Sequence, residues 1–270
     1  MSESQKTTDL SPKQIMIAES FLLSVKNELH FVKGYEFHLA RFRRSIKKIL
    51  KESGQNFGAE QEQELFRFLE SIPNTLTKAK TSAFPRLECH LHIDNDRLAA
   101  KPVILKYKIL MRAAPPITPH LNIVAQQQNI NEKVWAKGPN IGNYSKMQDI
   151  HGGEVLLTDS KGHLLETTTA AIVWWEDDTL FGVPQTTKRV TSITEKLVFE
   201  IATNLGFNTE TKFATPKEVS TKPLWALNAL HGIRSANLTY ISSASFNQNQ
   251  RLTNFRRSYN ALEEILKQLD

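Results

Sequence analysis

Residues 152–184 read GGEVLLTDSKGHLLETTTAAIVWWEDDTLFGVP, and this segment predicts three successive β-strands. Its apolar runs are separated by polar turns at 160–162 and 176–178, which contain the Ser, Gly and Asp residues that turns favour. The densest apolar run, AAIVWW at 170–175, has the length of a buried strand and is far too short to cross a membrane. We therefore expect a sheet in the second half of the chain.

Further strands and two helices are predicted on the C-terminal side of this segment. A helix is expected over 192–205 and ends at Gly206, because glycine is the residue most typical of helix C-termini. Strands are expected at LWALNAL (224–230) and LTYISSAS (238–245). The last helix, over 254–269, carries an apolar face made by Phe255, Tyr259, Leu262, Ile265 and Leu269.

The first half of the chain alternates strand pairs with helices. Residues 17–32 predict two short strands that turn near Lys26 and Asn27. Helices are expected over 37–52 and 59–72, the second ending before Pro73. Further strands are expected at 84–94, 101–112 and 121–125, with a turn at Asn95–Asp96. Together with the second half, this order predicts an α+β fold.

The length of 270 residues favours two lobes, since an average domain has about 150 residues. The polar stretch QQQNINEK at 126–133 is the best candidate for the boundary between them. We predict a mobile tail, an N-terminal α+β domain, an interdomain linker and a C-terminal domain, at 1–14, 15–125, 126–136 and 137–270.

The net charge of +6 is concentrated in one helix. The run RFRRSIKKILK at 41–51 holds six basic residues and no acidic one, a pattern that by itself would suggest nucleic acid. Apolar residues recur at helical spacing through the same run, so the cations mostly form the solvated face of an amphipathic helix. These solvated cations are Arg43, Arg44, Lys47, Lys48 and Lys51. We expect neither nucleic acid nor a membrane as a partner.

The single cysteine, Cys89, excludes an internal disulfide and a zinc site built on paired cysteines. This usage, together with an N-terminus that lacks an apolar signal-peptide region, favours a cytoplasmic protein. His90 and His92 lie two residues apart on one strand face and could ligate a metal, but two histidines without a third ligand are more typical of a surface, so no metal site is predicted.

Six segments in a fixed order resemble the class IV aminotransferases, the fold-type IV enzymes that use pyridoxal phosphate (PLP). They are HLARFRRS (38–45), AFPRLE (83–88), AKGPNIGNY (136–144), residues 152–184, VTSITEKLVFEIATNLGF (190–207) and LWALNALHGIRSA (224–236). The stretches NALHGIR and ETTTAAIVWW are most similar to the aminodeoxychorismate lyase branch. The resemblance implies a D-amino-acid-aminotransferase-like fold, with a smaller N-terminal α/β sandwich, a larger C-terminal domain with a barrel-like sheet, and a homodimer.

The resemblance also assigns the two central catalytic positions. Lys137 matches the lysine that binds the PLP aldehyde as an imine, and a desolvated amine can form that imine and then carry a proton. Lys146, nine residues further on, is the one close competitor. Glu166 matches the glutamate beside the pyridine nitrogen, where a carboxylate keeps the ring protonated and able to accept electrons.

A phosphate site follows from the same resemblance. Thr191, Ser192, Ile193 and Thr194 open a helix, whose free N–H groups and dipole suit a dianion. The same composition also serves ordinary helix capping. Arg41 matches the family's phosphate-contacting arginine, and Asn228 and Ala229 match residues that close the phosphate site from the opposite side.

The substrate candidates are Arg86, Leu230, His231 and Arg234, since an arginine suits a substrate carboxylate. The leading functional hypothesis is a 4-amino-4-deoxychorismate lyase that releases pyruvate and p-aminobenzoate through an external aldimine. One alternative is an aminotransferase on branched-chain or D-amino acids with 2-oxoglutarate. Another is a catalytically silent relative, or a binding module that uses the basic face of residues 41–51.

Overall fold

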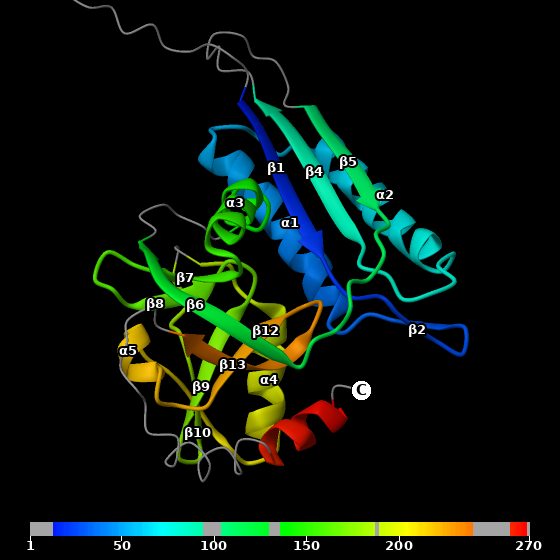
Figure 1. The fold of residues 1–270 in the computed structure, drawn as a ribbon. Coiled ribbons are helices and arrows are strands. Elements are labelled where there is room, and N and C mark those ends of the chain that lie inside the picture. Colours follow the sequence, from blue (N-terminus) through cyan, green and yellow to red (C-terminus); the bar gives the residue numbers. More distant parts are fainter. Residues whose placement is uncertain (1–12, 94–103, 130–135, 187–188, 240–259, 269–270) are drawn as a thin grey trace, which may run out of the picture.

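The computed structural model describes residues 13–93, 104–129, 136–186, 189–239 and 260–268 (Figure 1). Residues 1–12 of the predicted tail, the turn at Asn95–Asp96 and most of the strand at 238–245 lie outside the described residues. The same holds for the end of the linker at 130–135 and for Phe255, Tyr259 and Leu269 of the last helix. The last two residues of the predicted tail, Lys13 and Gln14, instead begin a strand, so the predicted end of the tail is wrong.

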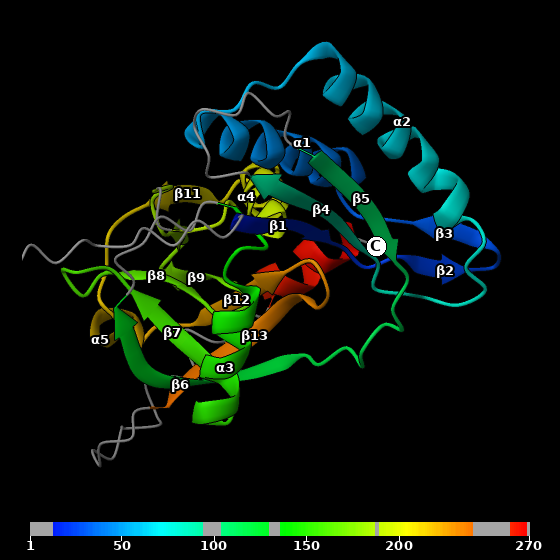
Figure 2. The ribbon, with the colours of Figure 1, turned by 90° about the horizontal axis from the view of Figure 1, so that it is seen from above.

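A small antiparallel sheet and two helices form the first unit. The sheet has the order β1 (Lys13–Ser20), β4 (Arg86–Ile93), β5 (Ile104–Leu110). Helices α1 (Tyr35–Glu52) and α2 (Ala59–Leu76) cover one face of it, as Figure 2 shows. A short hairpin, β2 (Ser24–Lys26) and β3 (Leu29–Phe31), extends from this unit.

The amphipathic pattern of α1 determines how the helix lies. Phe42, Ile46 and Leu50 are buried against the sheet, while the cations Arg43, Arg44, Lys48 and Lys51 are exposed, which confirms the solvated-face prediction. Both Arg43 and Lys47 form ion pairs with Glu62 of α2. The basic face is therefore partly neutralised within the chain.

Helix α2 does not end before Pro73, so that prediction is wrong. It continues through Pro73 to Leu76, because Ile72 and Leu76 are buried in the core and hold the last turn in place. A proline removes one backbone donor from a helix, and the burial of these two side chains compensates for that loss.

An eight-stranded sheet forms the second unit, in the order β11-β10-β9-β12-β13-β6-β7-β8. The strands are β6 (His120–Asn129), β7 (Glu154–Thr158), β8 (Leu164–Thr167), β9 (Ala171–Glu176), β10 (Thr179–Gly182), β11 (Asn208–Thr211), β12 (Leu224–Asn228) and β13 (Gly232–Thr239). The sheet curls, so that its two edges approach each other. The N–H of Leu164 in β8 donates to the carbonyl of Ala214, just after β11, at 2.8 Å. The barrel-like sheet of an α+β fold is confirmed.

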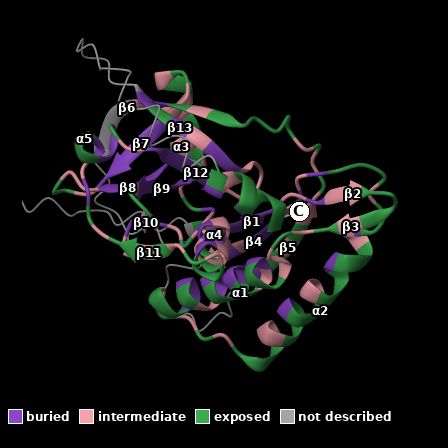
Figure 3. Ribbon diagram, turned by 90° about the horizontal axis from the view of Figure 1, so that it is seen from below, coloured by how far each residue is buried: buried purple, intermediate pink, exposed green. Residues whose placement is uncertain are grey.

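Helices cover this sheet and complete its cores. Helix α4 (Ile193–Asn204) and helical residues 260–268 pack on one face, where Ala261 and Ile265 are buried. Figure 3 shows the buried stretches of the sheet in purple along β7, β8 and β9. The short helix α5 (Pro216–Val219) contributes Val219 to the core on the other face. None of the described helices is both long and apolar enough to cross a membrane.

The segment 152–184 contains four strands, β7 to β10, where the sequence predicts three. The predicted middle strand is interrupted between Thr167 and Ala171, because the Thr167 hydroxyl accepts the N–H of Ala170 at 3.0 Å and donates to the Ala170 carbonyl. Side chains that bond to nearby backbone groups compete with the sheet ladder in this way. The break places three threonines at one end of the sheet.

The predicted linker, 126–136, begins inside strand β6, so its predicted start is wrong. Strand β6 runs from His120 through Asn129 and pairs with β13 and β7, and therefore belongs to the large sheet rather than to the N-terminal domain. Polarity alone misled the prediction, since backbone pairing along a strand does not require apolar side chains. We propose that the division between the two units lies between Arg112 and His120.

Candidate active site

A cavity of about 500 Å³ lies between the two units. Residues of the small unit line one side of it, among them His38, Arg41, Arg86 and Arg112. The large unit contributes Lys137, Glu166, Ser192, Ile193, Thr194, Asn228, Ala229, Leu230 and His231. Of the residues predicted for the site, Thr191 and Arg234 are absent from the described lining of the cavity.

Strand β1 holds the backbone at Lys137. The N–H of Ala18 donates to the Lys137 carbonyl at 2.9 Å. At Gly138 the backbone φ is +128°, and an added Cβ would lie 2.4 Å from the Met16 carbonyl oxygen and 2.7 Å from the Ala18 nitrogen. Only glycine permits so close an approach of two backbones. The glycine after Lys137 therefore lets the lysine backbone rest directly on β1.

The amine of Lys137 has a lowered pKa. Burial disfavours the charged ammonium, and the nearby Arg41, Arg112 and Arg86 repel it, while Glu19 acts in the opposite direction. Together these causes lower the pKa of Lys137 to about 8. A large share of the amine is therefore neutral near pH 8, the state in which an amine is a nucleophile or a base.

Glu166 on β8 is a buried carboxyl group with little support from the described protein. Its Oε1 accepts one long hydrogen bond, from the N–H of Val190 at 3.4 Å. Burial raises its pKa to about 8, although the charge of Arg189 and the Val190 N–H act in the opposite direction. A buried carboxylate needs a partner, and this one faces the cavity. The site can therefore accept a cationic or hydrogen-bonding group of a ligand at this point.

The raised pKa of Glu166 predicts how stability depends on pH in the polypeptide without a ligand. The folded chain holds the Glu166 proton up to about pH 8, whereas the unfolded chain releases it near 4.5. The stabilisation is fully present below pH 4.5 and is lost as the pH rises to about 8, so the free energy of unfolding falls in that window. The variant Glu166→Gln cannot ionise at this position, so this part of the pH dependence of its free energy of unfolding disappears. Between pH 4.5 and pH 8 the free energy of unfolding of the wild type should therefore fall by a few kcal/mol more than that of the variant, the order of magnitude that such pKa shifts give.

Urea denaturation of both proteins between pH 5 and pH 8 measures this difference. Lys137 is present in both proteins, so its own titration cancels in the comparison. Two stability profiles that stay parallel across the window would show that Glu166 ionises normally in the folded chain.

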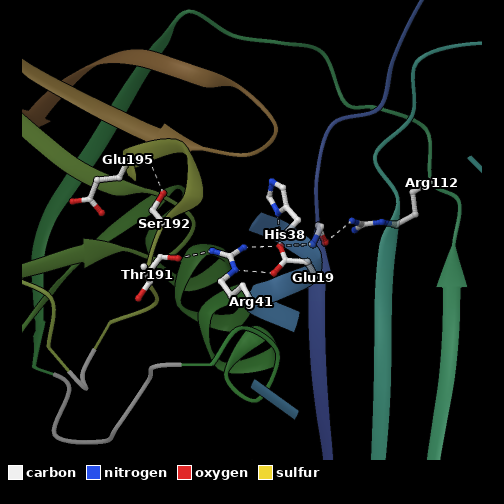
Figure 4. A network of polar contacts seen from close by, with 8 residues as sticks. Glu19, His38, Arg41, Arg112, Thr191, Ser192 and Glu195 are labelled. Carbon is white, nitrogen blue, oxygen red and sulfur yellow. Dashed lines mark hydrogen bonds and ion pairs between the residues drawn. The ribbon is translucent and has the colours of Figure 1, made fainter. Parts of the chain in front are cut away.

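Arg41 joins the two units at the start of α4, as Figure 4 shows. Its Nη1 donates to the Thr191 carbonyl at 2.6 Å, and its other nitrogens bond Glu19. Ser192 is the N-cap of α4, since its Oγ accepts the N–H of Glu195 at 3.2 Å. Arg189 and Glu195 form a buried ion pair beside this turn at 2.9 Å, which fixes the chain that enters the helix. Free helical N–H groups and a guanidinium therefore face the same part of the cavity.

The turn after β12 forms the opposite wall. The Asn228 Oδ1 accepts the N–H groups of Leu230 at 3.1 Å and His231 at 2.8 Å, so this side chain shapes the turn. The Ala229 carbonyl accepts the N–H of Leu22, which ties the turn to the small unit. His231 Nδ1 accepts the N–H of Thr118 at 3.2 Å, and burial lowers its pKa. His231 is therefore a neutral group of the wall near neutral pH.

Three arginines differ in their positions. Arg86 lines the cavity and pairs with Glu88 at 2.5 Å. Arg112 also lines it, donating to the Phe84 carbonyl and to Ser20 Oγ, with no ion pair to any described carboxylate. Arg234 is buried in β13, outside the cavity lining, and its Nε and Nη2 have no hydrogen-bond partner in the described chain. Arg234 is therefore absent from the lining, and its predicted substrate role stays a prediction.

Sequence reasoning missed Glu19, His38 and Arg112. Glu19 is an acid within the apolar strand sequence IMIAES, and a buried carboxylate in an apolar strand signals a cationic partner. That signal could have identified Glu19. Arg112 follows a strand at a loop and has no such signal, because only the packing of the two units brings it to the cavity.

Solved aminotransferases share this fold. The branched-chain aminotransferase of the archaeon Thermoproteus uzoniensis, solved with norvaline, gives a TM-score of 0.69 at 16% identity and covers 94% of this chain and 88% of that one. A hypothetical aminotransferase from Mycobacterium tuberculosis, bound to α-ketoglutarate and PMP, gives 0.68 at 11% identity with 98% and 92% covered. The Escherichia coli branched-chain aminotransferase gives 0.62 at 15% identity with 84% and 77% covered. At these identities the likeness establishes the fold alone.

The structure is thus a two-unit α+β fold with a cavity that contains a lysine and a buried carboxyl. The chain belongs to the class IV aminotransferase family, whose model matches residues 22–238. The search of curated proteins finds no match. The family resemblance predicted from the six segments is confirmed, and the match does not distinguish lyases from aminotransferases within the family.

Proposed function

We propose that the protein binds PLP in this cavity and acts as a 4-amino-4-deoxychorismate lyase, releasing pyruvate and p-aminobenzoate. The observation that carries the cofactor assignment is that Lys137, Glu166 and the N-terminus of α4 line one cavity. The lyase assignment is supported by the resemblance of NALHGIR and ETTTAAIVWW to that branch.

The residues of the cavity fit the functional groups of PLP. When bound, PLP supplies an aldehyde that combines with amines and a protonated ring that accepts electrons. The Glu166 carboxyl, buried with one long hydrogen bond from the described chain, would hold the proton on the ring nitrogen. The free N–H groups of α4 and the Arg41 guanidinium would hold the phosphate, and Lys137 would hold the aldehyde carbon.

Lys137 would also carry the proton in the reaction. Its lowered pKa, about 8, lets the neutral amine accept the proton from the amine-bearing carbon of the substrate and donate it onward. In the lyase reaction the bond between the neighbouring ring carbon and the ether oxygen would break as the ring becomes aromatic, and the lysine would pass the proton to the departing enolpyruvyl group, which leaves as pyruvate. In a transamination the same lysine would return the proton to the cofactor.

The cations of the cavity suit a substrate with two carboxylates, as aminodeoxychorismate has. Arg86 and Arg112 both line the cavity, and a planar guanidinium binds a carboxylate through two parallel hydrogen bonds. Arg112 has no ion pair within the described chain, which leaves part of its donor set for a ligand. Leu230 and His231 would limit the other side of the bound substrate.

An aminotransferase acting on branched-chain or D-amino acids, with 2-oxoglutarate as acceptor, is the second candidate. It is favoured by the solved branched-chain aminotransferases that share the fold. A substrate comparison separates the two candidates. The purified protein with PLP is offered aminodeoxychorismate, and separately a panel of amino acids with 2-oxoglutarate. We expect pyruvate and p-aminobenzoate from the first and no glutamate from the second; glutamate formation without p-aminobenzoate would establish the alternative.

We also propose that the protein is a cytoplasmic homodimer. A homodimer is supported by family membership, and a cytoplasmic location by the single cysteine, which is buried. A catalytically silent relative is disfavoured by the presence of both Lys137 and Glu166 at the cavity. A binding role for the basic face is disfavoured by the pairing of two of its cations with Glu62.

A further inference from the structure

We propose that Glu19 is a positioning residue, which holds the Arg41 guanidinium in the orientation needed to bind an anionic ligand group at the N-terminus of α4. The inference rests on the proposed function, in which that group is the phosphate of PLP. The sequence and the family match assign no role to Glu19, and it lies on β1, in the other unit from α4.

The contact between Glu19 and Arg41 is bidentate. Glu19 Oε2 accepts the Nε–H of Arg41 at 2.7 Å, and Glu19 Oε1 accepts from Nη2 at 2.5 Å. The third nitrogen, Nη1, donates to the Thr191 carbonyl at 2.6 Å (Figure 4). The planar guanidinium is therefore held from both sides, and one N–H on each of Nη1 and Nη2 remains for a ligand.

Glu19 is itself rigidly held. Its side chain is 1% exposed, and its Oε1 also accepts from His38 Nδ1 at 2.8 Å and from the N–H of Ser20 at 3.1 Å. Burial raises the pKa of a carboxyl, but the charge of Arg41 and the hydrogen bond from His38 more than offset this and keep the pKa of Glu19 well below its usual range. The carboxylate therefore remains ionised near neutral pH.

An electrostatic role and a positioning role of Glu19 predict opposite changes in anion affinity when its carboxylate is removed. The negative charge of Glu19 partly neutralises Arg41, so a purely electrostatic effect of removing it would strengthen the binding of an anion. A positioning effect would weaken that binding, because the freed guanidinium loses its orientation and must be ordered again when the anion binds. The sign of the change therefore distinguishes the two roles.

Glu19 also influences Lys137, and the experiment must separate this effect. Its charge raises the pKa of Lys137, and the N–H of its neighbour Ala18 bonds the Lys137 carbonyl. Both influences act on any aldehyde that combines with the lysine. PLP and pyridoxal carry the same aldehyde and differ in the phosphate, so the ratio of their dissociation constants isolates the anion site.

The test measures that ratio for the full-length protein by titrating apo-enzyme with PLP and with pyridoxal and following the absorbance near 420 nm, about the wavelength of such imines. The proteins compared are wild type, Glu19→Gln, Glu19→Asp, Arg41→Gln and the double variant Glu19→Gln/Arg41→Gln. Glu36→Gln is the matched control, because it removes an exposed carboxylate from the same unit. We expect Glu19→Gln to reduce the preference for PLP about tenfold or more, the scale of a charge-assisted hydrogen bond. Glu36→Gln should leave it unchanged.

In the double variant we expect no further loss beyond that of Arg41→Gln, because Glu19 acts through the arginine. An unchanged or increased preference for PLP in Glu19→Gln, while Arg41→Gln loses it, would overturn the inference. Should Glu19→Gln fail to fold, Glu19→Asp keeps the charge and withdraws the carboxylate by one methylene. Full preference in that variant would likewise overturn the inference.

Failure of the proposed function gives a different result. If wild type forms no band with either aldehyde, the cavity is not a PLP site. If wild type and Arg41→Gln show the same ratio, Arg41 is not part of the phosphate site, and both the assignment of Arg41 and the role of Glu19 fail. Melting temperatures of all variants accompany the titrations, since a purely structural defect would affect PLP and pyridoxal alike.

Discussion

Lys137→Ala is expected to abolish turnover, with a loss of roughly 10³-fold or more, and to remove the absorbance band near 420 nm. The proposed function gives this lysine two tasks, to hold the cofactor aldehyde and to carry the substrate proton. Alanine can do neither. The fold should survive, because the backbone bond from Ala18 to the carbonyl of residue 137 does not involve the side chain.

Lys146→Ala is the matched control for this prediction. Lys146 lies on α3 (Ile141–His151), is exposed, and does not line the cavity. Its removal should change neither the band nor the rate. Borohydride reduction of the wild type with PLP, followed by peptide mass analysis, should place the label on Lys137. Label on Lys146, or activity of Lys137→Ala within tenfold of wild type, would show that another amine does the chemistry.

Gly138→Ala is expected to destabilise the protein by about 3 kcal/mol or more, or to prevent folding. The new Cβ would lie 2.4 Å from the Met16 carbonyl oxygen, at a backbone φ of +128° that side chains rarely adopt. Either β1 moves or the chain at Lys137 moves. Chemical denaturation with urea measures the loss, and any folded protein that remains should bind PLP weakly because the lysine has shifted.

Gly142→Ala tests whether this effect comes from the close approach. Gly142 lies in the first turn of α3, and apart from its chain neighbours and its own helix backbone no described atom lies within 4 Å of an added Cβ. Alanine favours helix more than glycine, so the free energy of unfolding should rise by up to about 1 kcal/mol. Equal stability of the two glycine variants would contradict the view that β1 rests on the backbone at Gly138.

Helix α3 (Ile141–His151) was not predicted from the sequence. None of its residues is buried, so it lacks the apolar stripe by which α1 and α4 were predicted. Two other elements differ from prediction for another reason. Helix α2 extends past Pro73, and strand β6 extends into a polar run, because contacts with distant segments outweigh local preference. Helices α1 and α4, which have a strong apolar period, were predicted to within two residues of their observed ends.

By itself the sequence determined the α+β class, the amphipathic helix with its solvated cations, and the family, since these depend on local period and on ordered motifs. It also identified Lys137 and Glu166 as candidates. Only the tertiary structure brought Glu19 to Arg41 and Arg112 into the cavity. The direction of a side chain and its distance from groups far along the chain depend on how β1 and the curled sheet pack together. No local pattern encodes that packing, because it arises from contacts between segments more than a hundred residues apart, such as Ala18 with Lys137.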